Sequence, residues 1–390
     1  MRGLQLLCAV GTLCSIAYYV LCWWSAARFL RERRLAGGKG SSDVAARFPV
    51  SILKPLKGVD PEMVANFRSH CTQEYGEYEI LFGVSDPEDP AIEAVEQLKQ
   101  EFPQRKIRLI FCSDDLGANR KVSNLAQMAR QARHAHLVVS DSDIRVGNDY
   151  LRRVVAPLAN PEVGLVTCLY RGTANSTLGS KLEALGISTD FCAGVLVARF
   201  MEGVKFGLGS TLAFRRRDLE SIGGFEVLAD YLADDYQLGN RLAAKGLQVE
   251  LSDVVVETVL PRYSVAEFLG HQLRWARTVR DSRFWGYVGL GFTFGLPWAL
   301  LALLVSRGAW WAWSLMAIAM ALRAAMSVEV GVAVLQDRQL GPFLYLLPLR
   351  DLAAFLVWIT SFLGHTICWR GESFRLRRGK LTRVAGRDSN

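Results

Sequence analysis

The sequence predicts an α/β domain with a parallel, doubly wound sheet, flanked by transmembrane helices. Between residues 48 and 262, short apolar runs alternate with amphipathic helical patterns, which is typical of strand–helix–strand units. Long apolar runs lie on both sides of this region. The hydrophobic share of 51% is high for a soluble protein, and it agrees with several membrane segments.

An N-terminal transmembrane helix is predicted over residues 1–27. Residues 4–24 form an uncharged apolar run that is long enough to cross a bilayer. A basic cluster at residues 28–34 follows this run, whereas a signal peptide carries its basic residues in front. Positive charge on the trailing side places the next part of the chain in the cytoplasm. Residues 28–47 are interpreted as a basic linker.

The cytoplasmic domain is expected at residues 48–262. Strands are predicted at residues 50–53, 79–85, 107–111, 137–139, 163–169, 210–214 and 247–256. Helices are predicted at residues 91–102, 119–135, 215–222 and 231–245. One further apolar stretch, residues 184–204, contains Asp190, Arg199 and Glu202. We therefore expect it to be partly buried or membrane-facing and not to be a span.

Three carboxylates follow predicted strands and are the first candidates for a site. Asp86 ends one strand, and Asp141 and Asp143 end another, so all three are expected on the rim where open α/β sheets bind ligands. Two carboxylates one residue apart repel each other unless a cation or donors lie between them. A hard ion, Mg2+ or Mn2+, carried with a diphosphate would meet that need. A polar turn, with Asp side chains bonded to nearby amides, is the alternative.

Two later segments carry charge patterns that also admit two interpretations. Asp234 and Asp235 open a predicted helix, where carboxylates commonly just complement the helix dipole. Residues 263–283 interleave aromatic and apolar residues with Arg274, Arg277 and Arg280, as an interfacial helix does. This helix is either a lipid-surface helix or a cation cluster that faces a diphosphate.

The C-terminal part is predicted to be membrane-embedded, with three segments over residues 284–368 and a basic tail at 369–390. The segments are residues 284–305, with a mild break at Pro297, 310–335 and 343–367. Charged residues inside them (Arg323, Glu329, Arg350 and Asp351) are expected to pair with each other or to line a protein-filled face. Three crossings would put the basic tail outside, against the positive-inside rule. Either one segment does not fully cross, or the tail is an exception.

The net charge and the cysteines narrow the class of protein further. The formal net charge is +8, but the basic clusters at residues 28–34 and 375–380 each follow an apolar segment. Attraction to anionic lipid explains this placement, and we expect no nucleic-acid partner. The eight cysteines show no CxxC spacing, so reduced, buried thiols are expected instead of a disulfide framework or a zinc site.

Five short motifs, taken in order, make the pattern specific. They are residues 51–61 (SILKPLKGVDP), 84–91 (VSDPEDPA), 141–146 (DSDIRV), 233–236 (ADDY) and 273–275 (LRW). This ordered set resembles glycosyltransferase family 21, the ceramide glucosyltransferase-like enzymes, and is similar to the bacterial hopanoid glycosyltransferases. The resemblance covers about residues 48 to 285, with similar membrane segments on both sides. It implies a GT-A (Rossmann-like) fold for the α/β domain.

The resemblance also implies roles for single residues. Asp86 would contact a uridine base, Asp141 and Asp143 would hold a diphosphate through Mg2+ or Mn2+, and Asp235 would be the general base. Lys121 and Asn124 lie where related enzymes have nucleotide-binding residues.

The signature that follows the aspartates reads Gln/Arg-x-x-Arg-Trp in the family. Arg274 and Trp275 match its end, and they would bind the nucleotide sugar. His271 stands at its first position, where a direct phosphate contact is expected. A histidine can donate a hydrogen bond there instead.

The implied protein is a membrane-bound inverting glycosyltransferase. It would move a hexose or N-acetylhexosamine from a UDP-sugar to the hydroxyl of a membrane lipid, either ceramide or a hopanoid polyol. A single displacement needs one base and charge neutralisation on the leaving diphosphate, and a carboxylate and a metal clamp supply these. We expect an integral, multi-pass membrane protein with a cytoplasmic catalytic domain, in the inner membrane if the source is bacterial.

Two rival functions remain open from the sequence. A processive polysaccharide synthase shares the aspartates, but three C-terminal segments look too few for a polymer channel. A non-catalytic membrane protein that senses a nucleotide sugar is the other rival, and it would have no use for a base at Asp235. The large α/β domain argues against a carrier or channel.

Overall fold

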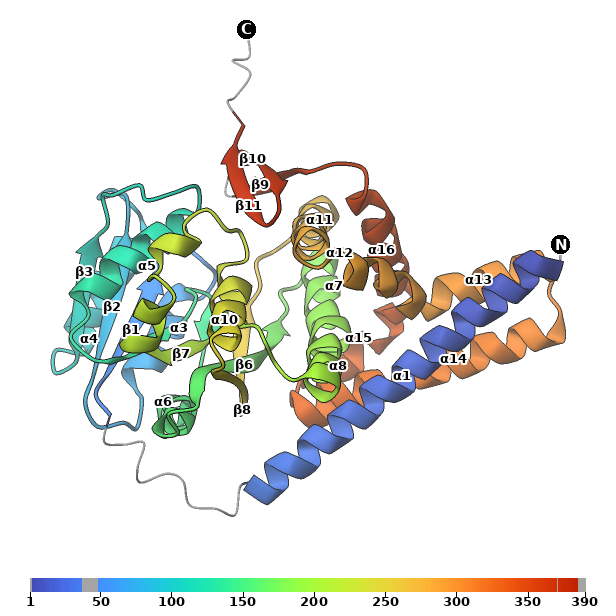
Figure 1. Cartoon of the computed structure of the whole chain (residues 1–390), viewed down its shortest axis with the longest axis horizontal. Helices are drawn as coiled ribbons and strands as arrows, with labels where there is room; N and C mark the ends of the chain where they lie inside the picture. Colours follow the sequence, from blue (N-terminus) through green and yellow to red (C-terminus); the bar gives the residue numbers. More distant parts are fainter. Residues whose placement is uncertain (1, 37–47, 370, 385–390) are drawn as a thin grey trace, which may run out of the picture. The chain divides into compact units, whose positions relative to one another are not determined.

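The computed structural model describes residues 2–36, 48–369 and 371–384. The chain forms two compact units (Figure 1). The sheet unit comprises Ala36–Thr173 and Gly203–Pro261, and the helical unit comprises Met1–Leu35, Ala174–Glu202 and Arg262–Asn390. The Gly-rich part of the predicted linker, residues 37–43, lies outside the described residues.

The sheet unit contains one mixed sheet of eight strands in the order β3-β2-β1-β4-β7-β6-β8-β5. The strands are β1 (Val50–Pro55), β2 (Tyr78–Val84), β3 (Lys106–Phe111), β4 (His136–Val139), β5 (Ile144–Arg145), β6 (Val163–Thr173), β7 (Leu212–Arg215) and β8 (Gln248–Val259). Strands β1 to β4 are mutually parallel, as predicted. Their carboxyl ends therefore share one rim.

Strand β7 departs from the predicted all-parallel order, because it runs antiparallel to both β4 and β6. A parallel return would need a crossover packed on the sheet. The segment between β6 and β7, Ala174–Glu202, belongs to the helical unit instead. The chain therefore re-enters the sheet at the rim where β4 ends, with Leu212 opposite Val139.

Helices cover both faces of this sheet, so the doubly wound arrangement is confirmed. The helices are α3 (Met63–Cys71), α4 (Ala91–Glu101), α5 (Arg120–Gln131), α6 (Tyr150–Val155), α9 (Arg216–Ser221) and α10 (Asp234–Ala244). Apolar side chains of α5, α9 and α10 form one core with Leu53, Leu81 and Phe214 of the strands. On the other face, Phe67 of α3 packs against Phe82 at 4.7 Å between ring centroids.

The helical unit contains α1 (Arg2–Ala36), α7 (Leu178–Gly186), α8 (Cys192–Glu202), α11 (Val265–Ser282), α12 (Phe284–Gly289), α13 (Gly295–Val305), α14 (Trp310–Val328), α15 (Leu340–Phe343) and α16 (Leu347–Ser361). Three short strands follow, β9 (Thr366–Trp369), β10 (Glu372–Arg377) and β11 (Lys380–Arg383), and they form an antiparallel sheet. Among the residues that the structure describes, four helical stretches are long and apolar enough to cross a membrane, and the bent pair α12–α13 makes a fifth if it counts as one span.

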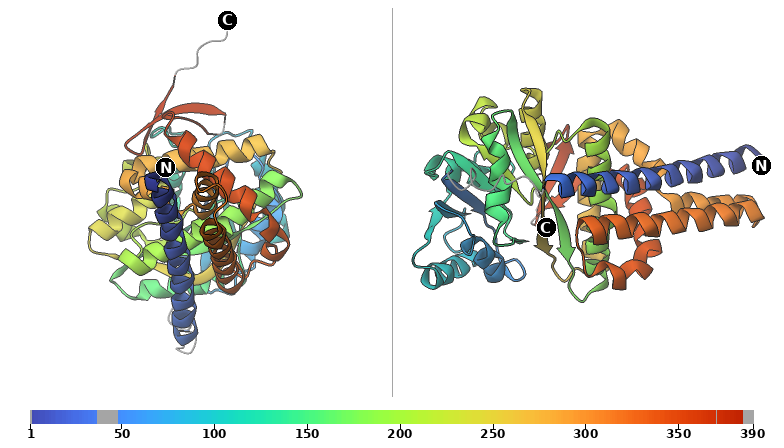
Figure 2. Two further views of the ribbon diagram at one scale, coloured as in Figure 1. Left: turned by 90° about the vertical axis from the view of Figure 1, so that its right-hand side faces the viewer. Right: turned by 90° about the horizontal axis from the view of Figure 1, so that it is seen from below.

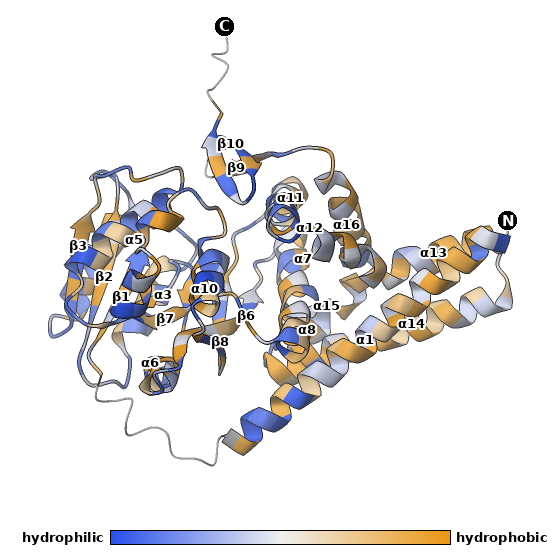
Figure 3. Ribbon diagram, in the orientation of Figure 1, coloured by the Kyte–Doolittle hydropathy of each residue, from blue (hydrophilic) through white to orange (hydrophobic). Residues whose placement is uncertain are grey.

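Helix α1 lies beside α13 and α14 (Figures 1 and 2). The Gln5 side chain donates to the Val305 carbonyl at 3.2 Å, and the Gly295 N–H donates to the Tyr19 hydroxyl at 3.0 Å. Helix α13 is therefore antiparallel to α1. Hydrophobic residues cover much of these helices (Figure 3), and Trp24 and Leu304 are among those exposed. This exposure suits contact with lipid.

Several predicted boundaries differ from the structure. Helix α1 continues to Ala36 and so contains the whole basic cluster, residues 28–34, that was assigned to the linker. The break in the first C-terminal segment is at Phe294, between α12 and α13, with a bend of 55°. Pro297 lies in the first turn of α13, where its missing N–H has no helical acceptor. The third segment ends at Ser361, and part of the predicted tail folds as β10 and β11.

The apolar stretch around residues 184–204 is helical from Leu178 to Glu202, with a π-helical turn at Ile187–Phe191. It is long enough to span a membrane. Its two flanks, however, enter the same sheet at β6 and β7, which is incompatible with a single crossing. This topology agrees with the expectation that the stretch is not a span.

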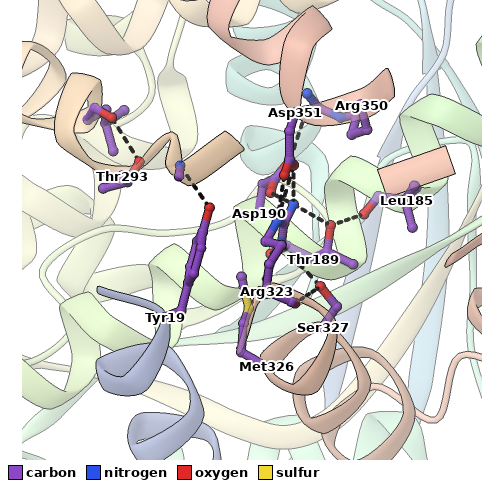
Figure 4. Close-up of polar contacts among 12 residues, drawn as sticks. Tyr19, Leu185, Thr189, Asp190, Thr293, Arg323, Met326, Ser327, Arg350 and Asp351 are labelled. Atoms are coloured by element: carbon purple, nitrogen blue, oxygen red, sulfur yellow. Dashed lines mark hydrogen bonds and ion pairs between the residues drawn. The ribbon is translucent and has the colours of Figure 1, made fainter. Parts of the chain in front are cut away.

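A buried ion network joins three parts of the helical unit (Figure 4). Arg323 of α14 is 2% exposed and lies 2.7 Å from Asp351 of α16 and 2.5 Å from Asp190 in the π-helical turn. Arg350 also contacts Asp190, at 3.3 Å, and donates to the Gln272 side chain of α11 at 2.9 Å. The predicted pairing of intramembrane charges is therefore confirmed for Arg323, Arg350 and Asp351.

We predict that Arg323→Met destabilises the protein strongly, because Asp351 and Asp190 would lose the cation between them. Breaking a buried ion pair in this way costs about 3–5 kcal/mol, which thermal unfolding of the purified protein in detergent would report. Arg307→Met, at an exposed position, is the matched control. If both variants unfold at the parent temperature, the network does not support the fold.

Candidate active site

A buried lysine donates hydrogen bonds to the turn after β4. Lys54, near the end of β1, is fully buried and donates to the Asp141 carbonyl at 2.8 Å and to the Ser140 hydroxyl at 3.2 Å. Burial lowers the pKa of Lys54 to about 7, although Asp141 and Asp143 act against this shift. Lys54 lies in a motif noted from the sequence but received no role there. The signal was a lysine within an otherwise apolar strand.

A buried histidine completes this support. His70 of α3 lies 3.2 Å from the Ser140 hydroxyl, through Nε2, and 3.0 Å from the Asn66 carbonyl, through Nδ1. Burial, together with the nearby Lys54, holds the pKa of His70 well below its usual value. The imidazole is therefore neutral and adds no charge beneath the Asp141 turn.

Lys121 joins the Asp141 turn to the start of α10. Its ammonium lies 2.7 Å from the Asp141 carboxylate and 3.5 Å from that of Asp234. Local structure explains this position, because Asn119 caps α5 and also donates to the Tyr231 carbonyl at 2.8 Å. The start of α5 is thus tied to the segment that leads into α10. Sequence reasoning proposed Lys121 as a site residue but did not assign Asp234.

Asp235 faces Asp141 across a glycine. A Cβ atom at Gly209 would lie 3.2 Å from Asp141 Oδ2, 3.3 Å from Asp235 Oδ2 and 3.8 Å from Lys121 Nζ. Two carboxylates from distant parts of the chain, which were predicted separately, therefore meet around Gly209. A side chain at this position would fill the space between them.

The charges at this point are unbalanced. Asp141, Asp234 and Asp235 carry three carboxylates, and Lys121 supplies one ammonium. Burial lowers the pKa of Lys121, but the carboxylates, with Asp141 foremost, raise it above its usual value overall. Burial and then Asp234 raise the pKa of Asp235 to about 6, and burial also raises the pKa of Asp234. An additional cation here would relieve the repulsion.

Asp143 lies on the other side of the same turn. Its carboxylate accepts a hydrogen bond from the Thr258 hydroxyl at 2.5 Å. Burial and then Asp141 raise the pKa of Asp143 to about 6. Ser142 donates to Asp60 of the first motif, so the turn is fixed from several directions. Both interpretations from the sequence therefore have support. The turn is tightly bonded, and Lys121 pairs with Asp141, whereas Asp143 is buried beside the Asp141 charge.

The carboxylates fit a metal ion only in part. Within the described ranges, no group of three or more His, Cys, Asp or Glu side chains is placed to hold one. Asp141 and Asp143 nevertheless offer hard oxygen ligands, and Mg2+ is commonly bound by one or two carboxylates together with substrate phosphates and water. The donor set fits an ion that arrives with a diphosphate.

Asp86 lies on the same rim, after β2. It is exposed, and its carboxylate accepts a hydrogen bond from the Glu88 N–H at 2.9 Å. Asn124 of α5 is buried and accepts a hydrogen bond from the Ser85 hydroxyl at 2.7 Å. Asn124 therefore supports the loop that carries Asp86. Its predicted contact with a nucleotide stays a prediction.

The signature residues His271, Arg274 and Trp275 belong to the helical unit, on α11. His271 Nδ1 lies 3.0 Å from the buried Glu183 carboxylate. The Trp275 ring packs 5.2 Å from His271 and 5.7 Å from Phe191. In this helix, His271 and Trp275 therefore contact α7 and the π-helical turn.

The cysteines carry no part of this site. All eight are free thiols, and six of them are buried. Cys14 and Cys368 are exposed. The predicted burial of the thiols is therefore confirmed for six of the eight cysteines.

Comparison with solved structures finds matches at low similarity. A mannosyltransferase from Pyrobaculum calidifontis, in complex with GDP-Man and Mn2+, is 20% identical with a TM-score of 0.49, over 90% of this chain and 99% of that one. TarS of S. aureus (residues 1–349), in complex with UDP-GlcNAc, is 12% identical with a TM-score of 0.42, over 87% of this chain and 100% of that one.

Sequence relatives are more informative. Ceramide glucosyltransferase 3 of Caenorhabditis elegans is 26% identical over 347 residues, which are 85% of this chain and 73% of that protein. Ceramide glucosyltransferase of Komagataella phaffii is 34% identical over 113 residues, which are 28% of this chain and 22% of that protein. The profile of the family described as Glycosyl transferase family 21 matches residues 7–382. This match confirms the expected α/β, GT-A fold class, and the chain belongs to glycosyl transferase family 21.

Proposed function

We propose that this protein is a membrane-bound, inverting glycosyltransferase that moves a hexose or N-acetylhexosamine from a UDP-sugar to the hydroxyl of a membrane lipid. The observation that carries the proposal is the meeting of Asp141, Lys121 and Asp235 around Gly209. One carboxylate is available for the donor diphosphate and another for the acceptor. Family membership and relatives named ceramide glucosyltransferase support this assignment.

Asp235 is the general base of the proposed reaction. Its carboxylate takes the proton of the acceptor hydroxyl while that oxygen attacks the anomeric carbon, and the bond to the diphosphate breaks in the same displacement. A base with a pKa near the working pH is suited to this task, and the pKa of Asp235 is raised to about 6. No covalent intermediate is required.

Asp141 and Asp143 are the proposed ligands of Mg2+ or Mn2+, which would neutralise charge on the leaving diphosphate. Lys121 fixes the Asp141 carboxylate, with 20% of the lysine side chain and 34% of the aspartate side chain exposed. Both are therefore open enough to meet a ligand. Lys54 holds the backbone of the same turn from below. Asp86 and Asn124 are assigned to the nucleotide.

Arg274 and Trp275 remain the proposed signature contacts to the nucleotide sugar. His271 is the departure from the family pattern, and its Nδ1 is already engaged by Glu183. Only Nε2 is left to meet a phosphate, and with Nδ1 protonated it donates only when the ring is charged. We therefore propose that His271 contacts the nucleotide sugar more weakly than Arg274 and Trp275 do.

The lipid acceptor is a ceramide or a hopanoid polyol. Either would offer a hydroxyl at the membrane surface, and an enzyme with its own membrane helices can take such an acceptor without moving it into water. The names of the relatives favour ceramide. We place the catalytic unit in the cytoplasm because the basic cluster follows α1. For a bacterial source, the membrane helices would lie in the inner membrane.

We predict that Asp235→Asn abolishes transfer but retains UDP binding, because the amide cannot accept the hydroxyl proton while Asp141 and Lys121 are untouched. A loss of at least about a hundredfold in turnover is expected from removing a general base. Turnover of the purified protein and calorimetric titration with UDP provide the two readings. Glu226→Gln, at an exposed carboxylate nearby, is the control. Near-normal turnover of the Asp235 variant would exclude the base assignment.

The pH dependence of turnover provides a second prediction. Asp235 must be ionised to act as a base, and its pKa is about 6. Turnover should therefore be constant well above pH 6 and fall about tenfold per pH unit below it. Initial rates in detergent across this pH range would measure the fall in turnover. A flat profile down to pH 4 would contradict the role of Asp235.

A further inference from the structure

A fully buried carboxylate of α7, Glu183, contacts two side chains of the signature helix α11. Its Oε1 lies 3.0 Å from His271 Nδ1, and its Oε2 accepts a hydrogen bond from the Gln272 side-chain N–H at 3.0 Å. An ionised carboxylate has no proton to donate and can only accept hydrogen bonds. The bond between Glu183 and His271 therefore needs a proton on Nδ1.

The orientation of the Gln272 amide follows from its second partner. Arg350 of α16 donates to the Gln272 side-chain oxygen at 2.9 Å. A glutamine amide can be turned over without changing its shape, but an arginine side chain has no acceptor atom. Gln272 must therefore present its oxygen to Arg350 and its NH2 group to Glu183.

Three elements of the helical unit hold Arg350 in place. The residue is 5% exposed, and its guanidinium lies 3.3 Å from the Asp190 carboxylate of the π-helical turn. The guanidinium carbon lies 5.9 Å from the centre of the Phe268 ring of α11. Gly186 of α7 leaves the space for this group, since a side chain at that position would overlap the guanidinium. Arg350 is therefore a fixed donor.

The hydrogen bonds consequently run in one direction, from Arg350 through Gln272 to Glu183. Glu183 accepts one bond from Gln272 and keeps its other oxygen for His271. Each member determines which atom the next one presents, so the donor-only arginine at one end determines where the imidazole at the other end carries its proton. We call Arg350, Gln272 and Glu183 the polar relay.

The second ring nitrogen of His271, Nε2, is left for a ligand. The imidazole stacks on the Tyr263 ring at 5.6 Å between ring centroids, and the Trp275 ring lies 5.2 Å away, so the plane of the imidazole is fixed. The His271 side chain is 20% exposed. Among the residues that the structure describes, none forms a hydrogen bond with Nε2. In a neutral imidazole one nitrogen donates and the other accepts, so Nε2 is an acceptor.

We propose that the polar relay fixes the proton of His271 on Nδ1, so that Nε2 accepts a hydrogen bond from a hydroxyl of the nucleotide sugar. An ionised phosphate cannot make this bond, because it has no proton to donate, whereas the ribose and the hexose both carry hydroxyls. The inference rests on the proposed function and specifies the contact that His271 makes there. Arg350, Gln272 and Glu183 are positioning residues, since they act through His271.

Exchanging amide and carboxylate tests the relay without changing its shape. In Glu183→Gln, the new amide would turn its oxygen to Gln272 and its NH2 group to His271, so the imidazole proton should move to Nε2. In the double variant Glu183→Gln, Gln272→Glu, the carboxylate at position 272 accepts from Arg350 and from the amide at position 183. The oxygen of that amide then accepts from Nδ1, so the proton should return to Nδ1.

Nitrogen–proton NMR spectra of the full-length protein with isotope-labelled histidine, in detergent and mildly alkaline buffer, show which ring nitrogen carries the proton. The chain has five histidines, and the signals lost in His271→Asn identify this ring. The control Glu202→Gln, at an exposed carboxylate of the helical unit, should keep the parent pattern. In the parent, a proton on Nε2 or on both nitrogens would overturn the proposal, as would an unchanged pattern in Glu183→Gln.

Titration of the same sample with UDP and with UDP-glucose tests the hydroxyl contact. Binding should shift the Nε2 resonance in the direction expected for an accepted hydrogen bond and leave the proton on Nδ1. A shift with both ligands assigns the ribose hydroxyl, and a shift with UDP-glucose alone assigns the hexose hydroxyl.

Two results would overturn the hydroxyl contact. One is binding, measured by calorimetry, without a shift of Nε2, and the other is a ring that becomes protonated on both nitrogens when the ligand binds, as a phosphate contact requires. A parent protein that binds neither ligand would contradict the proposed function and the hydroxyl contact with it. The proton position in the ligand-free protein would still decide whether the relay exists.

Discussion

The candidate site depends on one ammonium among three carboxylates. Lys121 contacts Asp141 and Asp234, and Asp235 lies within the same group around Gly209. One lysine holds this arrangement together without neutralising it, and the pKa of Asp235 is raised as a result of burial and of Asp234. Such a site favours a cation, and the divalent ion proposed to accompany the donor diphosphate would supply this charge.

The sheet explains why residues so distant in sequence come together. Parallel strands β1 and β4 deliver Lys54 and Asp141 to one rim, and the antiparallel β7 begins at that rim, so that Gly209 arrives just before it. The departure of Ala174–Glu202 into the helical unit is what allows β7 to return directly. The mixed sheet and the site are therefore consequences of the same chain path.

Much of this could be predicted from the sequence, because strand and helix periodicity is local. The predicted strands match the observed ones closely, and Asp141, Lys121 and Asp235 do meet. Lys54 and Asp234 were missed as site residues because their roles depend on tertiary burial and on a contact from α5. The direction of β7 was missed because a single sequence does not show that the intervening helices leave the sheet.

In the helical unit too, the sequence predicted the segments but not their tertiary contacts. Apolar composition predicted the C-terminal segments, but it did not predict that α16 runs beside α11. That arrangement is visible only in tertiary contacts, from Arg350 to Gln272 and from Arg280 to the Ser361 carbonyl. The family resemblance supplied the roles of Asp86 and of the signature residues. Their contacts with a nucleotide sugar remain predictions, whereas the carboxylate group around Gly209 is a property of the fold.

The anomeric configuration of the product tests the central claim most directly. One base and a single displacement invert the configuration at the anomeric carbon, so a UDP-α-sugar should yield a β-linked lipid. The coupling of the anomeric proton in the NMR spectrum of the purified glycolipid distinguishes the two linkages. A β-linked product is the expected result, and an α-linked product would contradict the role of Asp235 as the base of a single displacement.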